Sequence, residues 1–552
     1  MTRMLARFSV IILATVSFLP LSAQKLNKAD KAIVSNLQSH IRYLADDKLE
    51  GRRAGTAGEK LAREYISNQF QTLGLLAKGD EEWYQPFEIN DGRQINPSTH
   101  FFINGADLKL EQDFFPLASS ASKSTEAAVS MALAEKGVPW FFDLKDVLEE
   151  NKNNPHFDLD DVIKTKANKS GEKGATAFIV YNSSSIADNV RFNGKDRVAP
   201  ATVPVLYITS DARKKYLSDI GATHDIKLKV DISEKMRVGH NVVGYIDNKA
   251  GTTIVLGAHY DHLGYGEDGN SMLRTGEKLI HNGADDNASG TSALIELARM
   301  LKLSKNKKNN YLFLAFSAEE LGLNGSKYFT EHPTIDLATV SYMINMDMVG
   351  RLNDSSKALQ VGGYGTSPWW GTLFAKMHNK KFNIKFDSSG TGPSDHTSFY
   401  RKDIPVLFFF TGLHSDYHRP SDDFDKINYT GELQILKLVV RVIEESSKQN
   451  KLVFTKTRET QSSSTARLGS ATMGIMPDYT FSGSGVRADG VSENRPAQKA
   501  GLKAGDVIVK IGDYNITSMD AYMQALSKFK KGDKTTVTYK RGNDLVEVEV
   551  IF

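Results

Sequence analysis

The sequence predicts an α/β protein whose largest part is an open sheet with helices packed against it. Between residues 239 and 450, short and almost entirely apolar runs alternate with segments of helical periodicity such as Ser292–Leu303. Strands that are buried on both faces of an α/β sheet show this pattern. The expected strands are Val242–Ile246, Thr253–Ala258, Tyr311–Phe316, Ser341–Met346 and Val406–Phe410.

Length and composition narrow the class of protein. The chain has 552 residues, more than one hydrophobic core usually organises, so several domains are expected. Its 40% hydrophobic and 24% charged residues are typical of a globular protein. The formal charge is only +3 and no long basic run is present, so we expect no nucleic-acid partner. Cysteine is absent, so a metal would have to be held by histidines and carboxylates.

The first residues predict export. An apolar run, Phe8–Leu21, follows Arg3 and Arg7 and is followed by two small residues. This is the pattern of a secretory signal peptide, here residues 1–23, and the run is shorter than the roughly 20 apolar residues of a membrane span. We therefore expect a periplasmic or extracellular protein without a membrane span after cleavage, an uncleaved anchor being the less favoured alternative.

The remaining segments follow in order along the chain. Residues 29–75 predict two amphipathic helices around a polar loop, the second starting near Thr56. Residues 110–238 change to polar stretches with short apolar runs, which indicates an inserted domain. A Ser/Thr-rich linker and a small domain with glycine-punctuated strands complete the chain. The expected domains are 24–109 with 239–450, the insert 110–238, the linker 451–470 and the last domain 471–552.

Acidic residues and histidines gather at the ends of the expected strands. Because the carboxyl ends of strands in an open α/β sheet meet at one edge, we expect these side chains to lie together. Singly, each could cap a helix or complement its dipole. Together, such carboxylates would repel one another unless divalent cations neutralised them. The residues are His259-Tyr260-Asp261-His262, Asp285-Asp286, Glu319-Glu320, Asp347 and Asp416-Tyr417-His418.

The residue types in this group favour zinc. Imidazole and carboxylate ligands without thiolates suit zinc, with cobalt or manganese as possible substitutes. Two histidines and three carboxylates fit a site of two metals that share one carboxylate. One of the two adjacent glutamates would then be free to act as a general base on a water molecule beside the metals.

These motifs resemble the zinc peptidases of family M28, which include bacterial aminopeptidases and relatives of glutamate carboxypeptidase. The resemblance covers the whole α/β part in order, and implies a phosphorylase/hydrolase-like α/β/α sandwich with a mixed sheet. The matching stretches are Leu49–Arg52, Gly55–Glu59, Gly257–Asp261, Gly283–Gly290, Ala318–Gly322, Asn345–Met348, Ser394–His396 and Tyr417–Asp422.

The resemblance also implies a set of ligands for two zinc ions per chain. Asp286 is preferred to Asp285 as the shared ligand because Asp286 begins the family's Asp-Asn-Ala-Ser-Gly pattern. The implied ligands are His259 and Asp347 at one zinc, Glu320 and His418 at the other, and Asp286 bridging both.

Further site residues follow from the same resemblance. Asp261 would orient the histidine that precedes it by two residues. Glu319 would be the general base toward a water between the zinc ions, and Tyr417 would help to hold the oxyanion. Asp395 and His396 would shape the substrate pocket, although Asp395 could equally be structural.

The insert and the C-terminal domain each resemble a known domain type. The insert resembles a mostly β protease-associated (PA) domain through Gly171–Val180 and Val203–Ile208, and would either limit peptide entry or serve as a structural lobe. The β-rich tail resembles a PDZ domain, whose groove binds peptide or protein C-termini. Its carboxylate-binding loop would be Met473, Gly474, Ile475 and Met476. An empty groove packed on the peptidase is the alternative.

The expected function is an exported two-zinc aminopeptidase that removes N-terminal residues from peptide substrates. Two alternatives keep the metal site and change the substrate: a carboxypeptidase or a glutaminyl cyclase. A non-catalytic PDZ adaptor is less favoured, because all five expected ligands and Glu319 are present together.

Overall fold

The computed structural model describes most of the chain beyond the expected signal peptide. Residues 1–23 and residues 458–470 of the expected linker lie outside it. None of the helices in the described residues combines the length and apolarity needed to cross a membrane. The described residues are 26–552 except 153–156, 158, 195–198, 274, 378–380, 458–470, 478–483, 492–494, 517–518, 527, 531 and 543.

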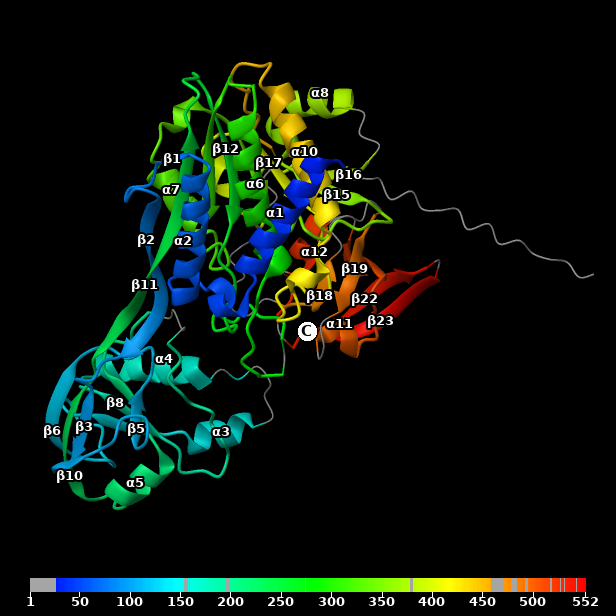
Figure 1. Cartoon of the computed structure of the whole chain (residues 1–552). Coiled ribbons are helices and arrows are strands. Elements are labelled where there is room, and N and C mark those ends of the chain that lie inside the picture. Colours follow the sequence, from blue (N-terminus) through cyan, green and yellow to red (C-terminus); the bar gives the residue numbers. More distant parts are fainter. Residues whose placement is uncertain are drawn as a thin grey trace, which may run out of the picture.

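A mixed nine-stranded sheet forms the centre of the largest part (Figure 1). Its order is β1-β11-β13-β12-β14-β17-β15-β16, and β2 pairs with β11. The four central strands are parallel, whereas β11 and β15 run antiparallel to their central neighbours. The bounds are β1 Leu76–Ala77, β2 Tyr84–Ile95, β11 Ile232–Ile246, β12 Thr253–His259, β13 Asn310–Phe316, β14 Val340–Met346, β15 Ala358–Gly362, β16 Asn383–Phe386 and β17 Val406–Phe410.

The α/β class and the mixed sheet are therefore confirmed. Every residue of the four central strands is buried, which is why their sequences are almost continuously apolar. The expectation missed β15 and β16. β16 has only four residues and none of them is buried, so it lacks the apolar run that marked the others.

Helices cover both faces of the sheet. On one face, α1, α2, α6, α8 and α10 share a core with the side chains of Leu256, Ile344 and Phe409. On the other, α7 and α9 pack on Val255 and neighbouring strand residues. The bounds are α1 Lys28–Leu44, α2 Ala57–Thr72, α6 Gly290–Leu303, α7 Asn324–Glu331, α8 Pro368–Met377, α9 His396–Tyr400 and α10 Tyr429–Ser446.

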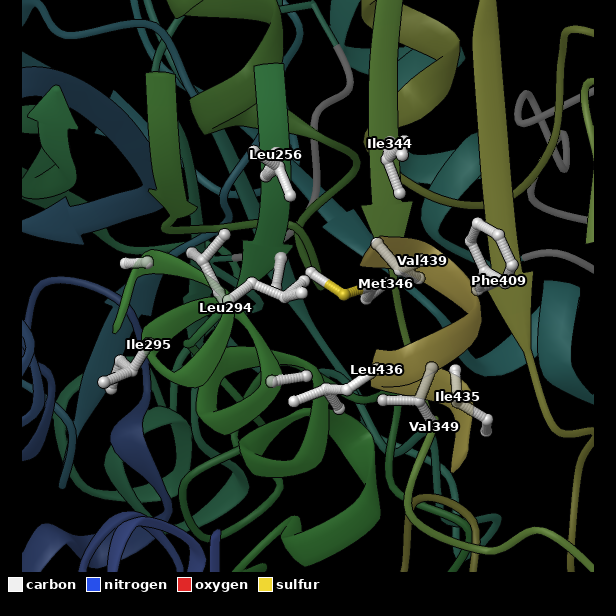
Figure 2. Packing of buried hydrophobic residues seen from close by; sticks show 14 of the residues in the cluster. Leu256, Leu294, Ile295, Ile344, Met346, Val349, Phe409, Ile435, Leu436 and Val439 are labelled. Carbon is white, nitrogen blue, oxygen red and sulfur yellow. The ribbon is translucent and has the colours of Figure 1, made fainter. Parts of the chain in front are cut away.

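Figure 2 shows how the first face is closed. Leu294 of α6 and Leu436 of α10 point toward the strand residues Leu256 and Met346. All four side chains are fully buried, and burial of each contributes about 1.5–3 kcal/mol relative to exposure. This packing fixes the two helices against the strands whose carboxyl ends carry the expected ligands.

The insert is reached through a long pair of strands. β2 and β11 stay hydrogen-bonded from the large sheet as far as Ile95 and Ile232, and the boundary expected at residue 239 falls inside β11. Beyond them lie an antiparallel sheet, β4-β3-β10-β6, and a mixed sheet, β5-β9-β8-β7, with a core of their own. The bounds are β3 His100–Ile103, β4 Ala106–Asp107, β5 Phe114–Pro116, β6 Ser124–Ser130, β7 Trp140–Asp143, α3 Lys145–Asn151, α4 Leu159–Glu172, β8 Phe178–Tyr181, β9 Val205–Ile208, α5 Ser210–Tyr216 and β10 Thr223–Lys229.

The C-terminal part is a separate β-rich unit, as expected. In its described residues, six strands and two short helices enclose a core that contains Met473, Ile508 and Tyr539. The bounds are β18 Ile475–Pro477, β19 Val486–Val491, α11 Pro496–Lys499, β20 Val507–Ile511, β21 Tyr514–Asn515, α12 Met519–Leu526, β22 Lys534–Arg541 and β23 Asp544–Ile551.

Glu432 on α10 should make the stability of the fold depend on pH. Its side chain is fully buried, and burial together with Asp285 raises its pKa well above the ordinary value of 4.5. The folded carboxyl group therefore keeps a proton that the unfolded chain releases. The contribution of this group to the free energy of unfolding is fully present below the ordinary pKa of the unfolded chain. It is lost as the pH rises toward the raised pKa of the folded state.

Glu432→Gln should remove this loss. The free energy of unfolding, measured by urea denaturation from about pH 5 to about pH 8, should fall less steeply with pH in the variant than in the wild type. Glu444→Gln, on the exposed side of the same helix, is the matched control and should follow the wild type. Equal slopes for all three proteins would contradict the raised pKa.

Candidate metal centre and active site

Three neighbouring strands bring their last residues to one edge of the sheet. β12 pairs in parallel with both β13 and β14, so their carboxyl ends lie side by side. His259 ends β12, Glu319 follows β13, and Asp347 follows β14 directly. Because the strands pair in parallel, expected site residues that are far apart in the sequence lie together at this edge of the sheet.

Two groups of metal-ligand side chains occupy this edge and share Asp286. One group is His259, Asp286 and Asp347, and the other is His262, Asp286 and Glu320. His259 Nε2 lies 3.3 Å from Asp286 Oδ1 and 3.4 Å from Asp347 Oδ1. In the second group, His262 Nδ1 lies 2.8 Å from Glu320 Oε1 and 3.9 Å from Asp286 Oδ2. His418 is not a member of this group, but its Nε2 lies 3.2 Å from both Asp286 Oδ2 and Glu320 Oε2.

These distances fit zinc. Ligand bonds of about 2.0–2.1 Å in a tetrahedral site require donor atoms to be separated by about 3.3 Å. The distances from His259 Nε2 and His418 Nε2 given above, 3.2 to 3.4 Å, all meet this requirement. The two oxygens of Asp286 face opposite histidines, which suits a carboxylate shared between two metals.

Asp285 points away from the two groups. Its Oδ1 accepts hydrogen bonds from Gly350 N at 2.7 Å and Ser289 Oγ at 3.0 Å, and its Oδ2 lies 3.1 Å from His414 Nε2. Asp286 instead lies between the histidines at the sheet edge. The geometry therefore favours Asp286 over its neighbour as the shared ligand.

The charges at this edge are strongly coupled. Burial alone would raise the pKa of Asp286, but hydrogen bonds from His259 and His418 hold it well below its ordinary value. Burial also opposes ionisation of Glu320, yet His418 lowers the pKa of that carboxyl to about 2. Burial would lower the pKa of His259, but Asp347 and Glu319 raise it well above 6.5. The carboxylates thus draw positive charge onto the imidazoles, the charge that divalent cations would otherwise supply.

Two further side chains hold the loop that carries Asp286. Asp422 Oδ2 accepts hydrogen bonds from the backbone N–H groups of Asp285 and Asp286, at 2.9 and 3.1 Å. Asn287 donates to Met346 O at 3.0 Å and accepts from Met348 N at 3.1 Å. Asn287 therefore ties this loop to the two residues that flank Asp347. The sequence analysis gave neither side chain a role, although both lie in the quoted motifs.

Asp261 contacts His259 chiefly through its backbone. His259 Nδ1 lies 3.2 Å from the backbone oxygen of Asp261 and 3.7 Å from the carboxylate oxygen Oδ1. That same Oδ1 accepts a hydrogen bond from Glu319 N at 3.1 Å. Asp261 thus links the histidine at the end of β12 to the expected general base after β13.

Glu319 belongs to neither group of possible ligands among the described residues. Burial raises the pKa of its carboxyl well above 4.5, and Asp347 and Asp395 add to this rise while His259 opposes it. A carboxyl group that belongs to neither ligand group and lies next to a possible metal site can act as a general base and acid.

The other expected site residues surround the same edge. The ring of Tyr417 stacks on His418 with centroids 3.8 Å apart, and that of His396 on Phe408 at 4.5 Å. Burial raises the pKa of Asp395 to about 7 and lowers that of His396 to about 3. The sequence analysis gave Ser394 no role, yet its hydroxyl donates to Asp347 Oδ2 at 2.8 Å.

The expected carboxylate-binding loop of the PDZ-like part opens its first strand. Met473 is buried, Gly474 has a φ of +73°, and Ile475 and Met476 begin β18. The loop is tied to the start of α11, because Ala497 N donates to Met473 O at 2.8 Å.

Gly283 generates a prediction about the loop of Asp286. Its φ is +55°, and an added Cβ would lie 2.5 Å from His262 Cδ2 and would also meet Asp286 O. Gly283→Ala should lower the melting temperature and weaken zinc binding, because relief of the clash moves Asp286 or His262. The matched control is Gly276→Ala, where φ is +78° but no atom of the described residues lies within 4 Å of the new Cβ. It carries only the backbone cost of a left-handed L-residue, about 1–2 kcal/mol.

Thermal unfolding and zinc titration of the two variants test this prediction. If Gly276→Ala impaired zinc binding as much as Gly283→Ala, backbone strain would explain the effect and the close packing around Asp286 would not.

Comparisons with known proteins agree with this geometry. Residues 241–443 match the model of peptidase family M28, and residues 455–552 that of the PDZ domain. Neither model covers residues 110–238, so the likeness of the insert to a PA domain stays a prediction.

Similar proteins are known from several bacteria. Aminopeptidase YwaD of Bacillus subtilis (strain 168) is 26% identical over 491 residues, 82% of this chain and 95% of that protein. Leupeptin-inactivating enzyme 1 of Streptomyces exfoliatus is 32% identical over 168 residues, 29% of this chain and 37% of that protein. The solved structure of a zinc aminopeptidase from Bacillus subtilis is 22% identical, with a TM-score of 0.42 over 76% of this chain and 98% of that one. With the shared Asp286 edge, the two matched models identify residues 241–443 as similar to peptidase family M28 and residues 455–552 as similar to a PDZ domain.

Proposed function

We propose that the chain is an exported, two-zinc aminopeptidase that hydrolyses N-terminal residues from peptides. The observation that carries the proposal is the pair of ligand groups that share Asp286, next to Glu319, which belongs to neither group among the described residues. The signal-peptide pattern of residues 1–23 supports export.

The proposed ligands are those that the resemblance to family M28 implies, and the 3.2 Å distances of His418 Nε2 to Asp286 and Glu320 support its inclusion. His259 and Asp347 would bind one zinc, Glu320 and His418 the other, and Asp286 both. When bound, the zinc ions would polarise the scissile carbonyl and lower the pKa of a water molecule. Cobalt or manganese could replace zinc at such ligands.

Glu319 would move the proton. Its carboxylate takes a proton from the attacking water while the water oxygen bonds to the carbonyl carbon. As the C–N bond breaks, Glu319 returns this proton to the leaving amine, and the enzyme is regenerated. The place of Glu319 beside the two ligand groups, and in neither of them among the described residues, supports this role. Tyr417, stacked on His418, is the candidate for steadying the developing oxyanion.

The choice of substrate rests on the relatives. The aminopeptidase of Bacillus subtilis (strain 168) aligns over 95% of its own length, which supports removal of N-terminal residues. A carboxypeptidase or a glutaminyl cyclase would use the same carbonyl chemistry on another substrate. The PDZ domain supports a second proposal, capture of peptide or protein C-termini at the loop of Met473, Gly474, Ile475 and Met476.

Glu319→Gln should lower kcat by about 10²–10⁴-fold, because the amide can neither accept nor return the proton. Zinc content should stay at two ions per chain, since Glu319 is not among the proposed ligands. Metal analysis and steady-state kinetics on a dipeptide substrate measure both quantities. Glu331→Gln, on the exposed side of α7, is the control and should retain normal turnover. Normal turnover of the Glu319 variant with zinc bound would exclude the proposed role.

A peptide panel distinguishes the possible substrates. Peptides with free N-termini should lose N-terminal residues, whereas N-acetylated peptides should stay intact, because an aminopeptidase recognises the free amine. Chelation should abolish the cleavage and added zinc should restore it, with products identified by mass spectrometry. Release of C-terminal residues would support the carboxypeptidase instead. Loss of ammonia from N-terminal glutamine would support the cyclase.

A further inference from the structure

His262 is a buried imidazole beside the second ligand group. Its side chain is fully enclosed, and its Nδ1 lies 2.8 Å from Glu320 Oε1. The ring of His418 stands nearly perpendicular to it, at a centroid distance of 5.8 Å and an angle of 74°. Two histidines therefore contact Glu320, and the proposed function uses only one of them.

The contact distances of the two histidines indicate different roles. His418 Nε2 lies 3.2 Å from both Asp286 Oδ2 and Glu320 Oε2, the spacing of two ligands on one zinc. His262 Nδ1 lies 2.8 Å from Glu320 Oε1, which is a hydrogen-bond length, and 3.9 Å from Asp286 Oδ2. The first pattern fits a ligand and the second fits a hydrogen-bond donor.

The two contacts on Glu320 also use different oxygens. His418 faces Oε2, whereas His262 faces Oε1. A carboxylate oxygen can only accept, so the proton between His262 and Glu320 belongs to Nδ1. His262 Nε2 is buried and has no hydrogen-bond partner among the described residues, so the tautomer protonated there would leave a buried N–H unsatisfied.

His262 is closely packed on two sides. Its backbone N–H donates to Arg52 O at 3.2 Å, and its ring lies so close to Gly283 that a Cβ there would meet it at 2.5 Å. His262 therefore lies between Arg52 and Gly283, with no room for a side chain at residue 283.

We propose that His262 is a positioning residue for the second zinc site. Its Nδ1–H holds Oε1 of Glu320, so that Glu320 presents Oε2 alone toward the metal. The inference rests on the proposed metal site, and it adds a contact on which the affinity of one zinc depends. Hydrogen bonds to ligand carboxylates typically change metal affinity about 10–100-fold.

Two variants of the purified protein test the inference. His262→Asn keeps an N–H close to the position of Nδ1, whereas His262→Phe keeps the ring and removes the donor. Competition with a chromophoric chelator gives the affinity of each zinc. His262→Phe should weaken the second zinc about 10–100-fold and leave the first unchanged. His262→Asn should stay within about threefold of the wild type, a rescue that loss of packing would not give.

The outcomes that overturn the inference are specific. Tight binding of both zinc ions by His262→Phe, or equal weakening in both variants, would exclude the hydrogen bond as the cause. Loss of one imidazole from the ligand-field spectrum of the cobalt-substituted His262→Asn variant would make His262 a ligand rather than a positioning residue. Metal affinity is read without any peptide substrate, so a failure of the proposed peptidase activity is a separate result.

Discussion

The structure around the site depends on one constraint, the burial of several carboxylates at one edge of a sheet. Asp261, Asp286 and Asp395 are all nearly inaccessible, and Glu320 lies close beside them. Taking such groups out of water costs free energy unless positive charge or hydrogen-bond donors compensate. The histidines and the backbone N–H groups at this edge supply part of that compensation, and divalent cations would supply the rest.

A buried arginine contributes to the same balance from behind the site. Arg52 is fully buried, and its guanidinium donates to the backbone oxygens of Tyr260, Asn282, Gly283 and Leu44. Burial lowers its pKa to about 10, while Asp261 and Asp286 act in the opposite direction. The cation therefore stays charged at neutral pH. Its hydrogen bonds connect Asn282 and Gly283, which precede Asp286, to Tyr260 at the end of β12, and it forms no direct ion pair with a proposed ligand among the described residues.

Much of this arrangement could be predicted because it depends on local patterns. Apolar runs marked the central strands, and acids or histidines after them marked the sheet edge. β16 could not be recognised, because pairing with β15 and not its own sequence makes it a strand. The role of Asp422 was hidden for a related reason: its partners at residues 285 and 286 lie 137 and 136 positions away. His262 was visible in its motif, but only the distances distinguish a donor from a ligand.

The pairing of β2 with β11 has a consequence for how the insert can change. The two strands enter the insert as one hydrogen-bonded ribbon, with a register shift between Glu234 and Met236. Side chains alternate between the faces of a strand, so loss of one residue from either strand would turn everything beyond it to the opposite face. The insert can therefore be brought nearer to the large sheet, or moved away from it, only if β2 and β11 lose or gain the same number of residues. A local bulge such as the present one, where Asp91 and Gly92 of β2 lie opposite the single residue Lys235 of β11, is the other way to absorb an unmatched residue.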